Sequence, residues 1–351
     1  MRSLIVSGLA ALAVALGVPA TAPAVAGAAG SIGTVACYGP KSCVGLGQYT
    51  PSQSSEYYLQ TWNGTAWGAV FAPLPGSEND SLYALSCASA RFCVAAGSTS
   101  PAEKVAPLAA TWNGTRWSVS KPPEPKGSPG GAFFNGISCA SATFCVAVGD
   151  YTRQVPDSAP ETEGFADTWN GRKWTISRQL RPKNRYVSYL GGVSCRSARS
   201  CVAVGGSYAD DVSLILYAKT AVAETELWNG RKWTAARPPA AGHEPVLEAV
   251  SCASARSCLA VGVGNNNAFT GPIRGIADSW NGHAWKAVAA AVPSHGGGRH
   301  QGDALDDVGC PAPADCVALG AAGPYQGSQV NFGFLFAERW NGKSLKLMSD
   351  S

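Results

Sequence analysis

The sequence predicts an all-β protein, a six-bladed β-propeller with four antiparallel strands and one C-x5-C disulfide per blade. Three observations support this prediction. The 351 residues contain 12 Cys that form six pairs of identical spacing, and 11 Trp that occupy two recurring positions. The first cysteines of successive pairs lie 50 to 58 residues apart, a repeat length typical of propellers. No segment shows the 3.6-residue period of an amphipathic helix.

The cysteines predict one local disulfide in each repeat. The pairs are Cys37/Cys43, Cys87/Cys93, Cys139/Cys145, Cys195/Cys201, Cys252/Cys258 and Cys310/Cys316, and they number repeats 1 to 6. Opposite positions of a hairpin bring two Cα atoms within disulfide reach. Zinc is the alternative, but the chain has only four His, all late in the sequence, and these cannot serve six sites. We therefore expect six disulfides, no bound metal and no cofactor.

A Trp-Asn-Gly motif follows every cysteine pair. Its tryptophans are Trp62, Trp112, Trp169, Trp228, Trp280 and Trp340, and a second Trp follows five residues later in all repeats except the sixth, which has Leu345. Asn-Gly is the preferred pair for a two-residue type I′ hairpin turn. We expect this turn to join the last two strands of each blade, and the tryptophans to be framework residues.

Repeat 2 illustrates the expected strands. They cover residues 82–87, 92–97, 108–112 and 115–119, and a Pro- and Gly-rich spacer at 121–131 follows them. Residues 27–351 are thus expected to form one propeller domain whose repeats span about 31–76, 77–128, 129–184, 185–242, 243–297 and 298–351. Three small sandwiches or an open β-solenoid are the alternatives, and even spacing without long linkers favours the closed ring. We expect no strand exchange between the two ends.

Residues 1–26 have the features of a secretory signal peptide. Arg2 provides the positive start, residues 4–18 the apolar stretch, and Ala24-Val25-Ala26 the cleavage site. The alternative is a membrane anchor, but the apolar stretch is short for a span of about 20 residues. We expect a secreted, extracellular monomer without a membrane span after cleavage.

The Asn-Gly turn and the second Trp resemble the BNR or Asp-box repeats of sialidase-like propellers. The matching residues are Asn63-Gly64 with Trp67, Asn113-Gly114 with Trp117, Asn170-Gly171 with Trp174, Asn229-Gly230 with Trp233, and Asn281-Gly282 with Trp285. The Asp-box itself reads Ser-x-Asp-x-Gly-x-x-Trp, whereas Asn directly precedes Gly here and the C-x5-C pair is additional. The resemblance implies the propeller fold, and a fold does not determine function.

Composition and charge exclude several classes of protein. Hydrophobic residues make up 46% of the chain and charged residues 14%, which argues against disorder and against a coiled coil. The 27 Lys and Arg and 23 Asp and Glu give a net charge of +4 and form no basic run. We therefore expect no nucleic-acid partner.

The connections after the second and fourth strands vary in length, and such loops on a rigid scaffold commonly carry recognition. The candidate binding residues at this end are Tyr49, Tyr83, Asn135, Asp150, Tyr151, Arg153, Tyr208, Asp210 and Tyr325. Tyrosines beside amide and carboxyl groups are typical of carbohydrate sites. In the alternative interpretation these tyrosines cap the blades at the rim.

Two functions remain open at this point. The first is a non-catalytic binding module that recognises glycans or a protein at the cell surface. The second is an extracellular glycoside hydrolase-like enzyme, for which the weak catalytic candidates are Glu248, Asp306 and Asp307, because such enzymes need two facing carboxylates. The inner-strand starts carry no Arg cluster and no G-x-S-x-G motif occurs, so the sequence leans against an enzyme. A purely structural envelope protein would show neither activity.

Overall fold

The computed structural model describes residues 30–39, 41–49, 56–68, 80–100, 104–156, 158–180, 185–209, 221–236, 238, 245–264, 274–291, 301–326, 329–330 and 334–348. Within these ranges every regular element is a β-strand. The expected signal peptide, residues 1–26, lies outside the described residues. The described part contains no helix that is long and apolar enough to cross a membrane.

Each repeat begins with an inner strand and a second strand that together form a hairpin closed by the cysteine pair. The inner strands are β1 (Gly30–Gly39), β4 (Asp80–Ser89), β8 (Ala132–Ser141), β12 (Val187–Ser197), β16 (Val246–Ser254) and β20 (Gln301–Ala312). The second strands are β2 (Ser42–Tyr49), β5 (Phe92–Thr99), β9 (Phe144–Arg153), β13 (Ser200–Tyr208), β17 (Ser257–Gly264) and β21 (Asp315–Gln326).

The six disulfides form as expected, with Cα–Cα distances of 3.9–4.0 Å. They join Cys37 to Cys43, Cys87 to Cys93, Cys139 to Cys145, Cys195 to Cys201, Cys252 to Cys258, and Cys310 to Cys316. Each bridge therefore lies within one repeat.

The second cysteine of every pair belongs to the hydrophobic core and to no functional surface. These residues are 0–4% exposed, and each lies in a different core cluster: Cys43, Cys93, Cys145, Cys201, Cys258 and Cys316. A buried, oxidised sulfur can neither contact a ligand nor act as a nucleophile. These residues, which sequence analysis singles out for their pairing, are thus framework residues and are not part of any binding site.

A third strand ends at the first Trp of each repeat, and a short outer strand starts at the second Trp or at Leu345. The third strands are β3 (Glu56–Trp62), β6 (Ala106–Trp112), β10 (Glu161–Trp169), β14 (Val222–Trp228), β18 (Arg274–Trp280) and β23 (Phe334–Trp340). The outer strands are β7 (Trp117–Ser120), β11 (Trp174–Gln179), β15 (Trp233–Ala235), β19 (Trp285–Val288) and β24 (Leu345–Leu347), while β22 (Gln329–Val330) pairs with β21.

The prediction of six separate four-stranded blades is wrong. The described strands form four sheets of at least four strands, which are the four blades, and one three-stranded sheet, β1-β2-β3. Repeats 3 and 4 share a single eight-stranded sheet because β10 pairs in parallel with β12 at Thr162 and Val187. Repeat 1 has only an isolated bridge between Trp62 and Trp67 where a fourth strand was expected. The fold is an all-β propeller with four blades.

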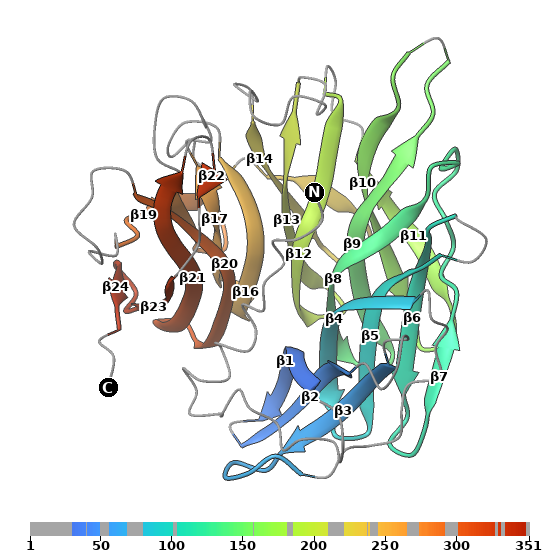
Figure 1. Cartoon of the computed structure of the whole chain (residues 1–351), viewed down its shortest axis with the longest axis horizontal. Coiled ribbons are helices and arrows are strands. Elements are labelled where there is room, and N and C mark those ends of the chain that lie inside the picture. Colours follow the sequence, from blue (N-terminus) through green and yellow to red (C-terminus); the bar gives the residue numbers. More distant parts are fainter. Residues whose placement is uncertain are drawn as a thin grey trace.

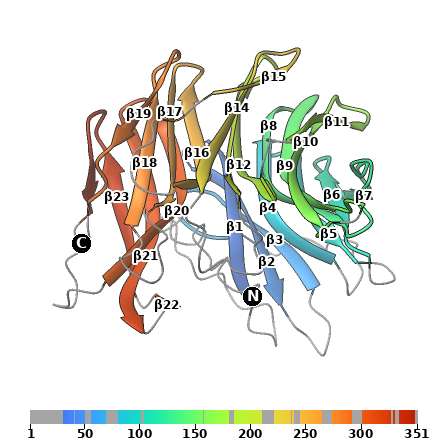
Figure 2. The same cartoon turned by 90° about the horizontal axis from the view of Figure 1, so that it is seen from above.

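The inner strands lie side by side in sequence order, β1 next to β4, then β8, β12, β16 and β20 (Figure 1). The outer strands β7, β11, β15 and β19 lie at the periphery (Figure 2). Apolar side chains from neighbouring repeats form one core cluster at each contact, as where Val94 and Ala96 of β5 meet Phe134 and Phe165 of repeat 3. Among the described strands, no hydrogen-bonded pair joins the first sheet to the last.

A serine ladder connects neighbouring inner strands. The backbone N–H of Cys139 donates to Ser86 Oγ at 2.9 Å, and the N–H groups of Cys195, Cys252 and Cys310 donate to Ser138, Ser194 and Ser251 in the same way at 2.9–3.0 Å. The ladder therefore holds the hairpin turns of repeats 2 to 6 at one level. Repeat 1 has Ala36 at the serine position, so it lacks this link.

The Asn-Gly turn differs from the expected two-residue type. Trp112 pairs directly with Trp117, so the turn contains four residues. The side chain of Asn113 closes it, because its Oδ1 accepts the backbone N–H groups of Thr115 and Arg116 at 3.0 Å. The glycine after each Asn has a positive φ of 89–97°. The two tryptophans pack at 5.5–5.7 Å between ring centroids in all five repeats that have both, which supports a framework role.

Candidate functional site

Every inner strand contains a β-bulge at the same level. The register shifts by one residue at Gly33, Tyr83, Asn135, Gly191, Glu248 and Asp306. A bulge leaves one residue out of the ladder and changes the direction of its side chain, and bulges are common beside functional sites. The four bulge residues that are not glycine are polar or aromatic, and all four are among the candidates proposed from sequence.

In repeat 4 the bulge contains glycine because the next strand lies very close. A Cβ on Gly191 would lie 2.8 Å from the backbone oxygen of Glu248, and one on Gly192 would lie 2.9 Å from the same atom. Because Gly191 and Gly192 have no side chain, the backbone of β16 can lie this close to β12. The same Cβ of Gly191 would lie 3.4 Å from Glu248 Oε2, so the Glu248 carboxyl group occupies space next to the glycine.

Tyr189 of β12 reaches across to the next repeat and donates a hydrogen bond to Glu248 Oε1 at 2.9 Å. Its ring stacks on Tyr208 of β13, with centroids 6.5 Å apart and planes 13° apart. Burial and the Glu248 charge raise the pKa of Tyr208 to about 12 and the pKa of Tyr189 well above its ordinary value. Both phenols are therefore protonated hydrogen-bond donors at neutral pH.

Asn135 of β8 connects repeats 3 and 4 in a similar manner. Its Nδ2 donates to Asp150 Oδ1 at 2.9 Å and to the backbone oxygen of Leu190 at 3.1 Å. Burial raises the pKa of Asp150 to about 7, although the hydrogen bond from Asn135 opposes this shift. Asp150 can therefore carry either a proton or a charge near neutral pH.

Repeats 5 and 6 contribute three more carboxyl groups. Desolvation raises the pKa of Glu248. The hydrogen bond from Tyr189 opposes this shift, and the charge of Asp306 adds to it. Desolvation also raises the pKa of Asp306 to about 6 and that of Asp307 to about 7. Asp307 Oδ1 accepts the N–H of Val308 at 2.8 Å, while its Oδ2 is buried and has no hydrogen-bond partner among the described residues.

We call seven residues from four repeats the inner-strand cluster: Asn135, Asp150, Tyr189, Tyr208, Glu248, Asp306 and Asp307. Tyr189 contacts Tyr208 and Glu248, Asp306 interacts electrostatically with Glu248, and Asn135 reaches this group through the backbone oxygen of Leu190. Burial raises the pKa values of Asp150 and Asp307 to about 7 and that of Asp306 to about 6, so these carboxyl groups can either hold or release a proton near neutral pH. The cluster therefore offers both donors and acceptors to a polar ligand. The described residues contain no group of three or more His, Cys, Asp or Glu arranged to hold a metal ion.

The remaining sequence candidates lie elsewhere. Tyr151 is fully buried, and its hydroxyl donates to Glu163 and accepts from Gln179. Arg153 forms ion pairs with Glu161 and Glu163, so its charge is already neutralised. Tyr83 is half-buried and lies near Tyr57, at the contact of repeats 1 and 2. The side chains of Tyr49 and Tyr325, and all of Asp210, fall outside the described residues.

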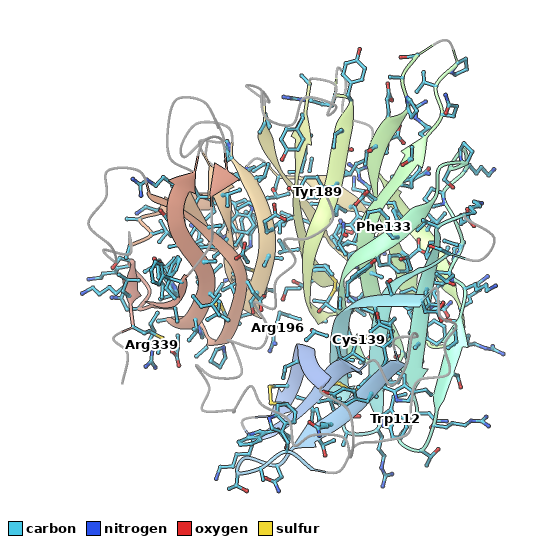
Figure 3. The ribbon with its side chains drawn as sticks, in the orientation of Figure 1. Trp112, Phe133, Cys139, Tyr189, Arg196 and Arg339 are labelled. Atoms are coloured by element: carbon cyan, nitrogen blue, oxygen red, sulfur yellow. A yellow bond between two sulfur atoms is a disulfide. The ribbon has the colours of Figure 1, made fainter. Side chains whose placement is uncertain are left out.

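Sequence reasoning missed Tyr189, the residue that joins the cluster together. Tyr189 lies two positions before the bulge glycine, whereas the sequence candidates came from the starts of the inner strands and from the segments that follow the second strands. Phe133 occupies the equivalent position on β8 (Figure 3). The two consecutive glycines that closely follow Tyr189 were the available signal, because they indicate a close backbone approach at this strand.

Comparisons with known proteins add little to this description. No family model and no curated protein matches the sequence. The chain is similar to the β-propeller domain of the Trilobed protease from Pyrococcus furiosus, described as having an open velcro topology, with 7% identity over 92% of this chain and 98% of that one, and a TM-score of 0.46.

Two further similar structures contain a bound carbohydrate. One is a polysaccharide lyase, the PL25 ulvan lyase bound to -[GlcA(1-4)Rha3S]-, with 12% identity over 87% of this chain and 80% of that one, and a TM-score of 0.49. The other is a mutant of the Aleuria aurantia lectin in complex with alpha-methyl-L-fucoside, with 10% identity over 90% and 94%, and a TM-score of 0.43. With TM-scores below 0.5, the class of the protein, a β-propeller, rests on its own strand pairing.

Proposed function

We propose that this chain is an exported, non-catalytic binding module and that the inner-strand cluster is its carbohydrate site. The observation that carries the proposal is the hydrogen bond from Tyr189 to Glu248 beside the stacked ring of Tyr208. It combines aromatic surface with a carboxyl acceptor, and the two groups come from different repeats. Sugars are bound by such sets, in which rings pack against CH groups and polar atoms bind hydroxyls.

The charge of the cluster restricts the sugar. Asp150, Glu248, Asp306 and Asp307 all come from the inner half of the sheets. Burial raises the pKa of Asp306 to about 6, so this group carries a negative charge when the pH is above that value. Uronate or sulfated sugars would be repelled by these carboxylates. The proposed ligand is therefore a neutral sugar or an amino sugar.

A glycoside hydrolase-like activity is the second candidate, and one observation favours it. Glu248 and Asp306 interact electrostatically, and both have raised pKa values, as a general acid of a glycosidase does. We rank it second because Glu248 Oε1 is already engaged by Tyr189 and Asn135 by Asp150. Side chains held by such hydrogen bonds fit a fixed binding surface better than a pair of catalytic groups that face a substrate.

We also propose secretion through residues 1–26. Six disulfides are typical of proteins that fold in an oxidising environment. N-terminal sequencing of the protein from the culture medium should give Gly27 as the first residue, and an intact Met1 would contradict export by cleavage. The resemblance to Asp-box repeats stays a prediction, supported by the Asn side chain that closes each turn.

The test is a glycan array probed with the wild type, Tyr189→Phe and Glu248→Gln, combined with chromatography of each bound sugar after incubation. Asp315→Asn is the matched control, since it also removes a carboxylate but lies in the hairpin turn at the far end. We expect the wild type and the control to bind a neutral or amino sugar without cleaving it, and both cluster variants to bind more weakly. Cleavage that is lost in Glu248→Gln would favour the enzyme, and unchanged binding in both cluster variants would exclude this site.

A further inference from the structure

The charges of this chain are separated between its two ends. The cysteine hairpin turns and the Trp-Asn-Gly turns contain eleven of the 27 Lys and Arg residues but only one of the 23 Asp and Glu residues, Asp315. These turns therefore carry a net formal charge of +10, while the rest of the chain, with 16 cations and 22 acids, carries −6. The two turns of one repeat lie far apart in sequence, so their cations form no run there.

The fold gathers these turns at one end. Cys201 pairs with Trp228 in repeat 4, and the equivalent pairing recurs in every repeat, so the two turns of a repeat lie next to each other. The serine ladder keeps repeats 2 to 6 level. We call the end that carries the cysteine hairpin turns and the Trp-Asn-Gly turns the basic end. Figure 3 shows Arg196 and Tyr189 at opposite ends of β12, so the basic end lies away from the inner-strand cluster.

The cations of the basic end are exposed but partly fixed. All eleven side chains are exposed, and in the part of the chain that the structure describes none of them forms an ion pair. The stems of Lys41, Arg91, Arg199 and Arg256 pack against the turn glycine of their own repeat, where a Cβ would meet them at 2.6–3.2 Å. This packing reduces the side-chain freedom that binding would otherwise remove.

Each turn also presents a neutral donor. The Asn Oδ1 is occupied by two backbone N–H groups in all six turns, as where Asn229 accepts from Arg231 and Lys232 at 3.0 Å. The Nδ2 group of the same exposed side chain remains as a donor. In repeats 3 and 4 this amide lies next to an Arg-Lys pair, which suits a ligand that carries both negative charges and hydroxyl groups.

We propose that the basic end binds a linear acidic polysaccharide. None of the exposed large hydrophobic side chains of the described residues lies in these turns, so the end offers nothing to insert into a lipid layer. In repeats 2 to 5 the first Trp donates its indole N–H to a hairpin carbonyl, as Trp228 does to Ala198 at 3.0 Å, and in repeats 1 and 6 it is buried. Such side chains are framework residues and offer little ring surface on which bases could stack. Exposed cations beside amide donors on a polar surface instead match a chain of charged sugars.

The experiment measures binding of the full mature chain to immobilised polygalacturonate, with neutral dextran as the reference, over about 50 to 300 mM NaCl. The variant is Arg231→Glu with Lys232→Glu. Both side chains are exposed, and only the backbone N–H groups of these residues bind the Asn229 side chain that closes the turn. The matched control is Lys121→Glu with Lys126→Glu, which changes the net charge equally in the spacer between repeats 2 and 3.

We expect the wild type and the control to bind polygalacturonate, and the basic-end variant to bind more weakly with a salt-dependence slope lower by about 2. Equal losses in both double variants would show that only net charge matters and would overturn the proposal, as would no binding by the wild type. Anionic phospholipid vesicles and duplex DNA are the comparison ligands. Tighter binding of either through Arg231 and Lys232 would overturn the assignment to a polysaccharide.

Discussion

At the scale of single residues, the fold buries polar and acidic side chains two positions before the first Trp of several repeats, which costs desolvation free energy. Asp167 of β10 is fully buried, and within the described ranges neither of its carboxyl oxygens has a hydrogen-bond partner. In four other repeats the position two residues before the first Trp is also a buried polar residue: Gln60, Glu226, Asp278 or Glu338. Among these described residues only Glu226 is seen to form an ion pair, with Arg178 at 2.6 Å. Burial raises the pKa of Asp167 to about 8, which keeps it largely protonated at neutral pH.

Replacing Asp167 by Asn should change the pH dependence of stability. A carboxyl group with a raised folded-state pKa keeps its proton in the folded protein while the unfolded chain loses it, so stability falls as pH rises between about 4 and 8. Asp167→Asn removes this contribution. We expect the free energy of unfolding of Asp167→Asn, relative to that of the wild type, to increase by about 1.4 kcal/mol for each pH unit by which the pH rises in that window.

Urea unfolding at several pH values measures this difference. Asp315→Asn serves as the control, because its carboxylate is partly exposed and pairs with the exposed Arg339. Parallel pH profiles for the wild type and Asp167→Asn would show that Asp167 keeps an ordinary pKa.

The bulge glycines provide a second residue-level prediction with an internal control. Gly191 and Gly33 occupy equivalent positions, but a Cβ at Gly33 would meet nothing closer than Leu46 O at 3.9 Å in the described part of the chain. Gly191→Ala would press against the backbone of β16 and should cost about 1–3 kcal/mol. Gly33→Ala should stay within about 0.5 kcal/mol of the wild type in urea unfolding. Equal effects would mean that β12 and β16 are farther apart than described.

At the level of elements, hydrogen bonds between strands hold the repeats in register. Ser138 Oγ accepts the N–H of Cys195 in the next inner strand, and replacing Ser138 by Ala would leave this partly buried donor unpaired. We expect Ser138→Ala to lower the free energy of unfolding by about 1–2 kcal/mol. Ser118→Ala, on the exposed face of β7, should have almost no effect. Chemical denaturation of both variants makes the comparison, and an effect of the same size at Ser118 would remove the case for the ladder.

The sequence predicted the parts of the fold that recur in every repeat. Cysteine spacing predicted all six disulfides, and the Trp-Asn-Gly motif predicted where the third strands end. The number of blades could not be obtained in this way, because the parallel pair between Thr162 and Val187 uses backbone groups that leave no side-chain pattern. The four-residue turn was missed for a related reason, since Asn-Gly also suits a shorter turn and only the Asn113 side-chain bond distinguishes the two.

At the scale of the whole molecule, both candidate surfaces, the inner-strand cluster and the basic end, form only because successive repeats lie side by side. The cluster was predictable in part: Asn135, Asp150, Tyr208 and the three weak acid candidates all belong to it. Tyr189 was not found, because its role depends on how closely β16 approaches Gly191. The basic end could not be found by a search for charge runs, because Arg199 lies beside Gly230, the neighbour of Arg231, only when the two turns of the repeat fold together.

A double-mutant cycle on Tyr189 and Glu248 tests the central claim most directly, because these residues are 59 positions apart and belong to different repeats. The free energy of unfolding is measured for the wild type, Tyr189→Phe, Glu248→Gln and the double variant. If β12 and β16 lie side by side as described, the two substitutions should be coupled by about 1 kcal/mol. Additivity within about 0.3 kcal/mol would contradict the contact, and with it the cluster that the repeats are proposed to build.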